Sequence, residues 1–297
     1  MQYIGRFAPS PTGPLHFGSL IAAVASYLEA RTHHGPWLLR MEDLDTPRTM
    51  PGAADAILAS LEAFGFQWDG SILYQSRRTA YYAEIFERLR AGGLVYPCAC
   101  TRKEIADSAT RGIEGAVYPG TCRNGLMPGR TARAWRIATE DMLTCFNDDI
   151  QGAVSQNLAR DIGDFVLKRA DGLFAYQLAV VADDAAQGVT HVVRGADLLD
   201  STPRQIYLQH LLQFPTPQYA HVPLATNAAG EKLSKQTKAR ALDDAHPLTE
   251  LWKALDFLGQ RPPAGLQRAS TAELWQWAFE QWQLNRIAGV RALTFTG

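Results

Sequence analysis

The sequence contains no apolar run near the roughly 18–20 residues that a membrane-spanning helix requires. It begins without a charged segment that leads into an apolar stretch, so no secretory signal is expected. Neither sign of charge is in excess, because 29 basic and 30 acidic residues give a net charge of −1. This composition does not fit a uniformly basic nucleic-acid-binding protein, so a polyanion would have to contact a local basic face. We expect a cytoplasmic protein that does not enter a membrane.

Cysteine is also scarce, with four in 297 residues, but two of the four are close neighbours. Cys98 and Cys100 are separated by one residue, and Cys122 follows across a loop. In a chain without an export signal, such clustering favours metal binding over a disulfide framework. Three thiolates can occupy three corners of a tetrahedral zinc site. The fourth ligand stays open between Tyr118, an unusual ligand, and Cys145, the ordinary chemical choice. The competing interpretation is that the three cysteines are reduced packing residues.

Short apolar runs alternate with stretches in which apolar residues recur at helical spacing, which predicts an α/β protein. The length of the chain suits about two domains. The residues at 3–7 and 37–41 are predicted to form strands. Apolar residues between 20 and 28 have helical spacing, and two further helices are predicted around 57–64 and 81–89. A strand-helix-strand-helix order is typical of a doubly wound parallel sheet.

The alternation is lost over residues 96–169, a stretch that contains the cysteine cluster and that we interpret as an insertion. Zinc there would be structural. The α/β pattern returns with 175–181 and 189–193, followed by a helix. That helix is expected to start at Ser201-Thr202-Pro203, where a hydroxyl N-cap would precede a proline in the first turn. Ser270-x-x-Glu273 has the spacing of a capping box for the last helix.

The string His16-Phe17-Gly18-Ser19 lies between the first predicted strand and the first predicted helix. Glycine lets a backbone approach a phosphate closely, and a helix N-terminus supplies free amide donors. The imidazole can donate to a phosphoryl oxygen as charge builds up during a displacement. Taken alone, so short a string is more often an ordinary turn between a strand and a helix.

Two further strings are as ambiguous when each is taken alone. Lys232-Leu233-Ser234-Lys235, preceded by Gly230, suits the binding of a leaving pyrophosphate, although most short lysine-rich stretches are solvated loops. In the opening stretch 6–13, Arg-Phe-Ala-Pro-Ser-Pro-Thr-Gly, two prolines and a glycine fix a rigid turn. Arg6 could hold a carboxylate there with two hydrogen bonds, or could be a surface arginine beside a structural turn.

In their order along the chain, these strings resemble the glutamyl-tRNA synthetase family of class I aminoacyl-tRNA synthetases. In that family the His-x-Gly and Lys-x-Ser-Lys strings are the two class I signature motifs. The resemblance covers roughly residues 3–238. Further matching stretches are Arg40–Asp45, Tyr176–Asp184 and Val193–Leu199.

The resemblance implies an enzyme that activates glutamate with ATP, accompanied by Mg²⁺. It implies a glutamate pocket formed by Arg6, Phe7, Ala8, Pro9, Ser10, Glu42, Tyr176 and Arg194. It implies an ATP site formed by His16, Gly18, Ser19, Lys232 and Lys235, with His16 and Lys235 catalytic. The two arginines would neutralise carboxylates, and Glu42 would accept from the α-ammonium group. The sequence departs from many full-length members at Val180, where they have asparagine, so we expect a weaker affinity for glutamate.

The stretch Tyr118–Arg123 resembles that of a shorter paralogous family, the glutamyl-queuosine tRNA(Asp) synthetases, in which a tyrosine completes the zinc site. This resemblance implies Cys98, Cys100, Tyr118 and Cys122 as ligands, with Cys145 as the alternative to Tyr118. Only 62 residues follow Lys235, whereas an independent domain usually has about 100–150 residues. The short tail points to the same paralogues, which make glutamyl adenylate without tRNA and esterify glutamate onto queuosine at the wobble position of tRNA(Asp).

We therefore predict an α/β fold with a Rossmann-like, doubly wound parallel catalytic core, in a monomer. The predicted divisions are 1–95 for the first half of the core, 96–169 for the zinc-containing insertion, 170–240 for the second half with the Lys-Leu-Ser-Lys loop, and 241–297 for a short helical region without an anticodon-binding domain. The predicted partners are ATP, L-glutamate and queuosine-containing tRNA(Asp).

The sequence leaves three alternatives to this function. A truncated enzyme of this type could charge the 3′ end of tRNA(Glu). A small-molecule nucleotidylyltransferase also uses His-x-Gly strings, but it would not be expected to have the Lys-x-Ser-Lys string or the glutamate pocket. A non-enzymatic, glutamate-binding regulator is disfavoured because His16 and Lys235 are both present.

Overall fold

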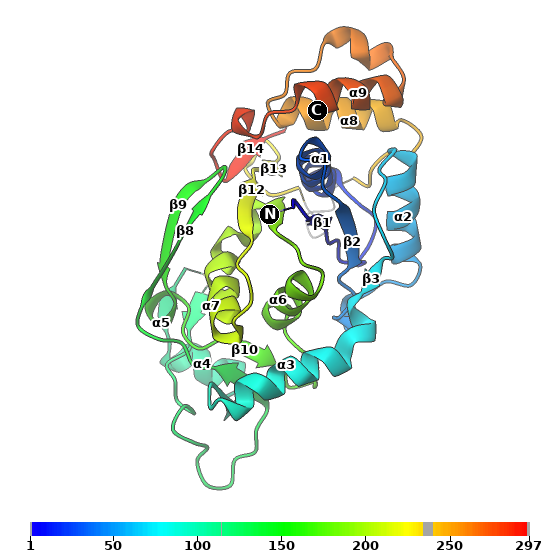
Figure 1. Ribbon diagram of the computed structural model, residues 1–297. Helices are drawn as coiled ribbons and strands as arrows, with labels where there is room; N and C mark the ends of the chain where they lie inside the picture. Colours follow the sequence, from blue (N-terminus) through cyan, green and yellow to red (C-terminus); the bar gives the residue numbers. More distant parts are fainter. Residues whose placement is uncertain (1, 114, 234–239, 296–297) are drawn as a thin grey trace.

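The computed structural model describes residues 2–113, 115–233 and 240–295, and its centre is a parallel β-sheet (Figure 1). The strands are β1 (Gly5–Phe7), β2 (Trp37–Met41), β3 (Leu73–Tyr74), β11 (His191–Gly195) and β12 (Gln218–Val222). β1 pairs with β2, β2 with β3, and β11 with β12, all in parallel. The Ile4 carbonyl accepts backbone hydrogen bonds from Thr190 (3.0 Å) and His191 (3.2 Å), which places β11 beside β1. The resulting order β3-β2-β1-β11-β12 is that of a doubly wound fold.

Two groups of helices cover the sheet. The first group is α1 (Phe17–Thr32), α2 (Ala53–Ala63), α8 (Pro247–Phe257) and α9 (Thr271–Gln281). The second group is α3 (Thr79–Ala91), α6 (Tyr176–Ala186) and α7 (Thr202–Leu212). Alternate strand residues such as Phe7, Leu39 and Val193 belong to one buried cluster with the first group, because successive side chains of a strand point to opposite faces. α6 and α7 form a separate cluster with α3.

The predicted insertion joins the core sheet through part of its length. Its elements are β4 (Val95–Cys98), α4 (Arg102–Ser108), β5 (Thr110–Gly112), β6 (Gly115–Val117), β7 (Ala134–Ile137), β8 (Leu143–Asp148), β9 (Gly152–Asn157), α5 (Leu158–Asp161) and β10 (Val166–Lys168). β4 and β10 flank β7 in an antiparallel sheet. β8 pairs with β9 and also, in parallel, with β12. The chain from 143 to 157 is therefore continuous with the sheet that contains β11 and β12.

The remaining elements are short. They are the 3-10 helices η1 (Thr46–Arg48), η2 (Gln75–Arg78), η3 (Ala196–Ser201), η4 (Ala264–Arg268) and η5 (Leu284–Arg286), and the parallel pair β13 (Leu224–Thr226) and β14 (Ala292–Thr294). Figure 1 places α8 and α9 at one end of the molecule and α4 and α5 at the other. Among the described residues, no helix combines the length and the apolar composition needed to cross a membrane.

Most of the predicted elements are present, with one correction at a helix cap. The capping box is confirmed, since the Ser270 side chain accepts from the Glu273 N–H and Glu273 reaches back to the cap. The segment 175–181 forms most of helix α6. α7 begins at Thr202 with Ser201 at the N-cap position and Pro203 in the first turn, as expected, but the Ser201 side chain does not make the predicted cap hydrogen bond. η3 leads directly into α7, so Ser201 is already helical and makes no cap hydrogen bond.

Candidate active site

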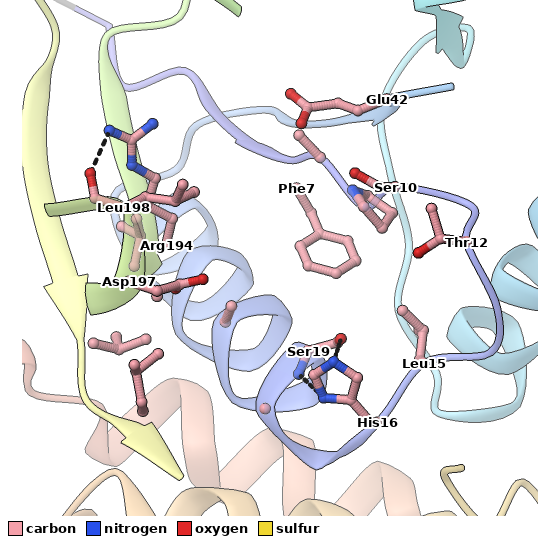
Figure 2. Close-up of a pocket in the computed structure, with 18 of the residues that line it drawn as sticks. Phe7, Ser10, Thr12, Leu15, His16, Ser19, Glu42, Arg194, Asp197 and Leu198 are labelled. Carbon is pink, nitrogen blue, oxygen red and sulfur yellow. Dashed lines mark hydrogen bonds between the residues drawn. The ribbon is translucent and has the colours of Figure 1, made fainter. Parts of the chain in front are cut away.

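A cavity of about 530 Å³ opens where the carboxyl ends of β1 and β11 lie side by side. In a doubly wound sheet this is the position where the strand order reverses and where ligands bind. The cavity brings together nearly all of the residues predicted for the two substrates. It is lined, among others, by Arg6, Phe7, Ala8, Pro9, Ser10, His16, Gly18, Ser19, Glu42, Tyr176, Arg194 and Lys232. Figure 2 shows Arg194 and Asp197 across the cavity from Ser10 and Thr12, with His16 and Ser19 at the end of α1.

One of the predicted residues falls outside the described part of the chain, and a second position singled out in the sequence does not line this cavity. Lys235 lies outside the described residues. Val180, where the sequence departs from many relatives, is 1% exposed and packs in the cluster that α6 forms with α3 and α7. A difference at Val180 can therefore act on the pocket only through the packing of α6.

The strand alternation places arginines on one face of the sheet. Arg6 in β1 and Arg40 in β2 are buried, and both contact Asp184 of α6. The distances to its Oδ1 atom are 3.4 Å from Arg6 Nε and 2.7 Å from Arg40 Nη1. Burial opposes ionisation of Asp184, but the two arginines outweigh it and lower its pKa. Arg40 also contacts Glu42 at 3.4 Å.

The pKa of Glu42 is shifted in the direction opposite to that of Asp184. Burial raises its pKa, although Arg40 and Arg6 both oppose that shift. A raised carboxyl pKa means that the charged form lacks sufficient stabilisation from the protein alone. An ammonium group in the cavity would supply that stabilisation.

Arg194, the last buried cation of the cavity, has an unsatisfied donor. Its Nε atom donates to His221 Nε2 (3.0 Å) and its Nη2 atom donates to the Thr202 hydroxyl (2.8 Å). Its Nη1 atom is buried and has no hydrogen-bond partner among the described residues. An unpaired buried donor is costly, and an anionic ligand in the cavity would satisfy it.

The start of α1 forms one end of the cavity. His16 is the N-cap of the helix, and its side chain accepts from the Ser19 N–H (3.3 Å). A Cβ atom on Gly18 would lie 3.2 Å from the His16 ring and 3.3 Å from the Leu233 carbonyl oxygen. The two signature strings are therefore in close contact at a position where any side chain larger than that of glycine would be crowded. A helix N-terminus of this kind is a favourable site for phosphate.

Lys232 lies on the same side of the cavity and forms an ion pair with Asp197, with 2.5 Å between Nζ and Oδ2. Asp197 follows β11 directly, and a Cβ atom on Gly195 would lie 2.6 Å from its Oδ1 atom. Glycine at that position lets the carboxylate approach the strand end. The pair joins the segment before Lys235 to the strand that carries Arg194.

The sequence interpretation did not identify Arg40, Asp184, His221 and Asp148. The first two form the ion cluster described above. His221 Nδ1 lies 2.6 Å from Asp148 Oδ2, and both side chains are fully buried. A signal was available, because Arg40 is the one polar residue of β2 and His221 stands between Ala220 and Val222 in β12. The partners of those residues could not be identified, since they lie far away in the sequence.

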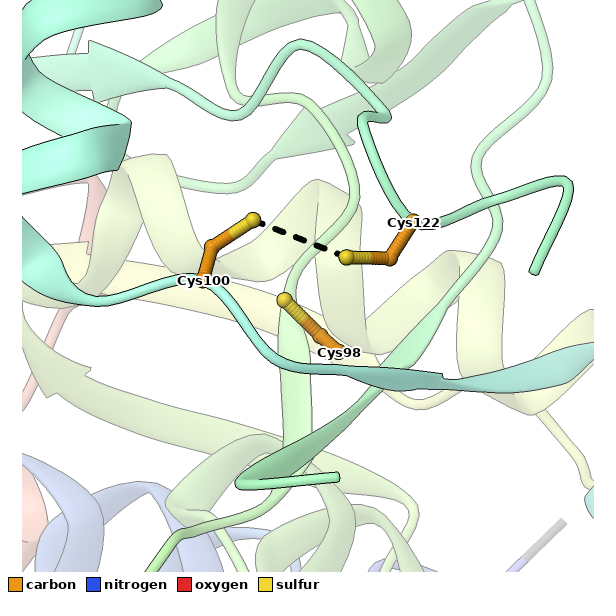
Figure 3. A group of neighbouring side chains, drawn as sticks. All are labelled: Cys98, Cys100 and Cys122. Atoms are coloured by element: carbon orange, nitrogen blue, oxygen red, sulfur yellow. Dashed lines mark hydrogen bonds between the residues drawn. The ribbon is translucent and has the colours of Figure 1, made fainter. Parts of the chain in front are cut away.

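The three clustered cysteines point toward one another near the start of α4 (Figure 3). Their sulfur atoms all lie within 4.8 Å of one another, and Cys100 Sγ is 3.6 Å from Cys122 Sγ. Tyr118 Oη lies 3.4 Å from Cys98 Sγ and 3.6 Å from Cys100 Sγ. In a zinc tetrahedron with bonds of about 2.3 Å to sulfur and 2.0 Å to oxygen, the edges measure about 3.8 and 3.5 Å. The spacing of these four side chains therefore fits the metal.

Cys145 is excluded as the fourth ligand. It lies on β8, is exposed, and does not belong to the group formed by the other three cysteines. The strand pairing of β8 with β9 and β12 holds it in a different sheet from Cys98. Of the basic residues near the cluster, Arg123 is paired with Asp164 and Arg130 with Glu104.

The chain is similar to known tRNA synthetases over nearly its whole length. The catalytic-domain family of class I tRNA synthetases (E and Q) matches residues 4–258. A glutamyl-Q tRNA(Asp) synthetase of Dechloromonas aromatica is 62% identical over 287 residues, which are 96% of this chain and 95% of that protein. The protein of the same name from Aromatoleum aromaticum is 61% identical over 95% of this chain and 89% of its own length. The crystal structure of a glutamate-tRNA synthetase from Elizabethkingia anophelis matches with a TM-score of 0.81 at 25% identity, covering 100% of this chain and 68% of that one.

Proposed function

The chain belongs to the glutamyl-Q tRNA(Asp) synthetases, which are class I aminoacyl-tRNA-synthetase-like ligases, and from this membership we propose its reaction. It activates glutamate with ATP, without tRNA, and transfers the glutamyl group to queuosine at the wobble position of tRNA(Asp). The observation that carries the first step is the buried, unpartnered Nη1 atom of Arg194 in the cavity that α1 enters with its N-terminus. A carboxylate of glutamate at Arg194 and a phosphate of ATP at the N-terminus of α1 would bring the two reactants together.

The first step joins glutamate to AMP. An oxygen of the glutamate α-carboxylate attacks the α-phosphorus of ATP, and the bond from that phosphorus to the bridging oxygen breaks. Pyrophosphate leaves with the electron pair of that bond. His16 and the first amides of α1 would stabilise the charge that develops on the phosphoryl oxygens. Lys232 and Lys235 would hold the leaving pyrophosphate, and Mg²⁺ bound with ATP would neutralise phosphate charge.

The pocket residues position the amino acid for this attack. Arg6 and Arg194 would hold carboxylates, while Glu42 would accept a hydrogen bond from the α-ammonium group. Phe7, Ala8, Pro9, Ser10 and Tyr176 would shape the remaining wall. In the second step a hydroxyl of the queuosine cyclopentene-diol attacks the glutamyl carbonyl. AMP leaves, and the proton of the hydroxyl passes to solvent.

Queuosine-containing tRNA(Asp) is proposed as the acceptor because the similar proteins are glutamyl-Q tRNA(Asp) synthetases. We expect labelled glutamate and ATP to label tRNA(Asp) that contains queuosine, and to leave an unmodified transcript of the same tRNA unlabelled. Ribonuclease fragments should place the label in the anticodon loop. Label on tRNA(Glu), or on the 3′-terminal fragment, would instead favour conventional charging by a truncated enzyme.

We also propose that Cys98, Cys100, Tyr118 and Cys122 hold a structural zinc ion within the division 96–169. The spacing of the four side chains supports this set. The other divisions proposed are 1–95 and 170–240 for the two halves of the catalytic core and 241–297 for the helical end of the chain.

The affinity for glutamate should fall on acidification, beginning above the ordinary titration range of a glutamate side chain. Burial raises the pKa of Glu42, and only its ionised form can balance the α-ammonium charge. As the pH falls through this raised pKa, the ionised fraction falls and KM for glutamate rises, by about tenfold for each further pH unit. The measurement is KM against pH in glutamate-dependent exchange of pyrophosphate into ATP.

Glu42→Gln is the control for that titration. It should raise KM at neutral pH and flatten the acid limb, because the substituted side chain no longer titrates. The same acid limb in both proteins would assign the titration to the substrate or to another group and contradict the role given to Glu42.

A further inference from the structure

A buried chain of hydrogen bonds leads from the cavity into the sheet through two residues that lie outside the cavity wall. Arg194 and His221 are register partners on the adjacent parallel strands β11 and β12. Asp148 ends β8, on the other side of β12, where it is the register partner of Tyr219. The contacts run from Arg194 Nε to His221 Nε2 (3.0 Å) and from His221 Nδ1 to Asp148 Oδ2 (2.6 Å).

Only one arrangement of donors and acceptors is consistent with these hydrogen bonds. A guanidinium group donates and cannot accept, so His221 Nε2 must accept from Arg194 and carry no proton. The proton of the neutral ring then lies on Nδ1, which donates to Asp148. Burial lowers the pKa of His221 to about 4, against the opposing effect of Asp148, so the ring is neutral at physiological pH.

Asp148 is itself held firmly at the end of β8. Its Oδ1 atom accepts backbone N–H groups from Ile150 (3.1 Å), Gln151 (2.8 Å) and His221 (3.1 Å). These bonds fix the carboxylate, which fixes the tautomer and the orientation of the imidazole. The imidazole in turn presents an acceptor to the inner edge of Arg194.

The consequence is a guanidinium group restrained at two of its three nitrogen atoms. His221 holds Nε, and the Thr202 hydroxyl, which can donate to the Leu198 carbonyl oxygen (3.1 Å), holds Nη2. Within the described part of the chain, Nη1 is the guanidinium nitrogen left without a partner and so available to a ligand. Restraint of this kind keeps a recognition group within the narrow range of geometry that binding and reaction need.

We propose that Asp148 and His221 are positioning residues that hold Arg194 in the orientation in which it binds a carboxylate of glutamate. This inference rests on the proposed function. His221 does not touch the substrate. It acts through the acceptor at Nε2, and Asp148 acts by keeping the proton on Nδ1.

Two substitutions of His221 separate the acceptor from the rest of the side chain. In His221→Gln, the terminal amide reaches the position of Nε2 and can still accept from Arg194. In His221→Asn, the shorter amide reaches the position of Nδ1, so it can donate to Asp148 but leaves Arg194 Nε without its acceptor. Both variants are uncharged and polar.

The test is KM for glutamate and for ATP in glutamate-dependent pyrophosphate exchange by the full chain, with Tm of each variant. His221→Asn should raise KM for glutamate roughly 10- to 100-fold with KM for ATP unchanged, because a small misplacement of a binding group has effects of that size. His221→Gln should recover most of the loss. Equal values of KM in the two variants, or losses that follow Tm, would overturn the proposal.

A second measurement, of the protonation of the His221 ring, needs neither an activity assay nor a variant of His221. The imidazole ¹⁵N signals of His221 in the unsubstituted protein should be those of the neutral ring with the proton on Nδ1. Asp148→Asn should alter those signals and raise KM for glutamate. A proton on Nε2 in the unsubstituted protein would overturn the positioning role of Asp148 and His221. If the ring has its proton on Nδ1 as expected but the protein shows no glutamate-dependent exchange, the result would reject the proposed function instead.

Discussion

Arg194→Met should reduce kcat/KM for glutamate in pyrophosphate exchange on the order of a hundred- to a thousand-fold. The side chain is 5% exposed, and its Nη1 atom is the unsatisfied buried donor of the cavity. Removing one partner of a buried, hydrogen-bonded charge pair costs about 2–5 kcal/mol, mostly because the other charge is left unpaired. In this site the unpaired group would be a carboxylate of the substrate.

The substitution should lower kcat/KM for glutamate and leave the stability of the folded protein nearly unchanged. In the variant, the Thr202 hydroxyl lies 3.2 Å from His221 Nε2 and can turn its proton from the Leu198 carbonyl to that acceptor. Methionine fills a similar volume. Arg194→Lys should fall in between, since it keeps the charge but loses the planar set of donors that holds Nε and Nη2 in place.

Arg90→Met is the matched control for this substitution. Arg90 lies on α3 and forms an exposed pair with Glu87, a type of contact that contributes little. Its kcat/KM should stay within about twofold of the unsubstituted protein. A similar loss of activity in both arginine variants would show that Arg194 acts through general stability, and unchanged activity in Arg194→Met would remove it from the pocket.

Cys98→Ser should lower the zinc content from about one ion per chain to near zero after dialysis against a chelator. A serine hydroxyl is a far poorer zinc ligand than a thiolate, and three remaining ligands hold the ion weakly. Cys98 is buried, and the Arg136 guanidinium contacts its sulfur at 3.4 Å. Because structural zinc contributes directly to folding, Tm should fall as well. Elemental analysis and thermal unfolding measure the two effects.

Cys145→Ser provides the control, because the exposed Cys145 lies on β8 outside the cluster. It should keep its zinc and its Tm. Tyr118→Phe tests the fourth ligand and should weaken zinc binding without abolishing it, since three thiolates remain. Full zinc content in Cys98→Ser would refute the site, and loss of zinc in Cys145→Ser would show that the ligand set is wrong.

The local features of the fold were accessible from the sequence because they depend on nearby residues. The helical spacing after Pro14 predicted α1, and the spacing of Ser270 and Glu273 predicted the capping box of α9. The Ser201 hydroxyl, expected to cap α7, instead accepts from Gln177 Nε2 (3.2 Å) and Arg204 Nη2 (2.8 Å). η3 also runs without a break into α7.

The candidate site likewise includes residues that could be found from the sequence and a choice that could not be made from it. Short strings placed His16, Gly18 and Lys232 together as phosphate-binding residues, and the structure brings all three to one cavity. The choice between Tyr118 and Cys145 could not be derived from the residues alone. Spacing along the chain does not tell whether a strand carries a thiol toward a cluster or away from it.

What the sequence by itself determined was the first strands and helices of the core, the last helix and the two signature strings, each of which depends on residues close together in the chain. The family resemblance followed from the order of those strings along the chain. The tertiary structure alone decided which buried charges meet. Asp184 joins Arg6 and Arg40 across more than 140 positions, and Asp148 reaches Arg194 through His221 across three adjacent strands. The physical reason is strand register: a shift of one residue would turn the strand side chains of Arg6, Arg40 and Arg194 to the opposite face of the sheet, away from their buried partners.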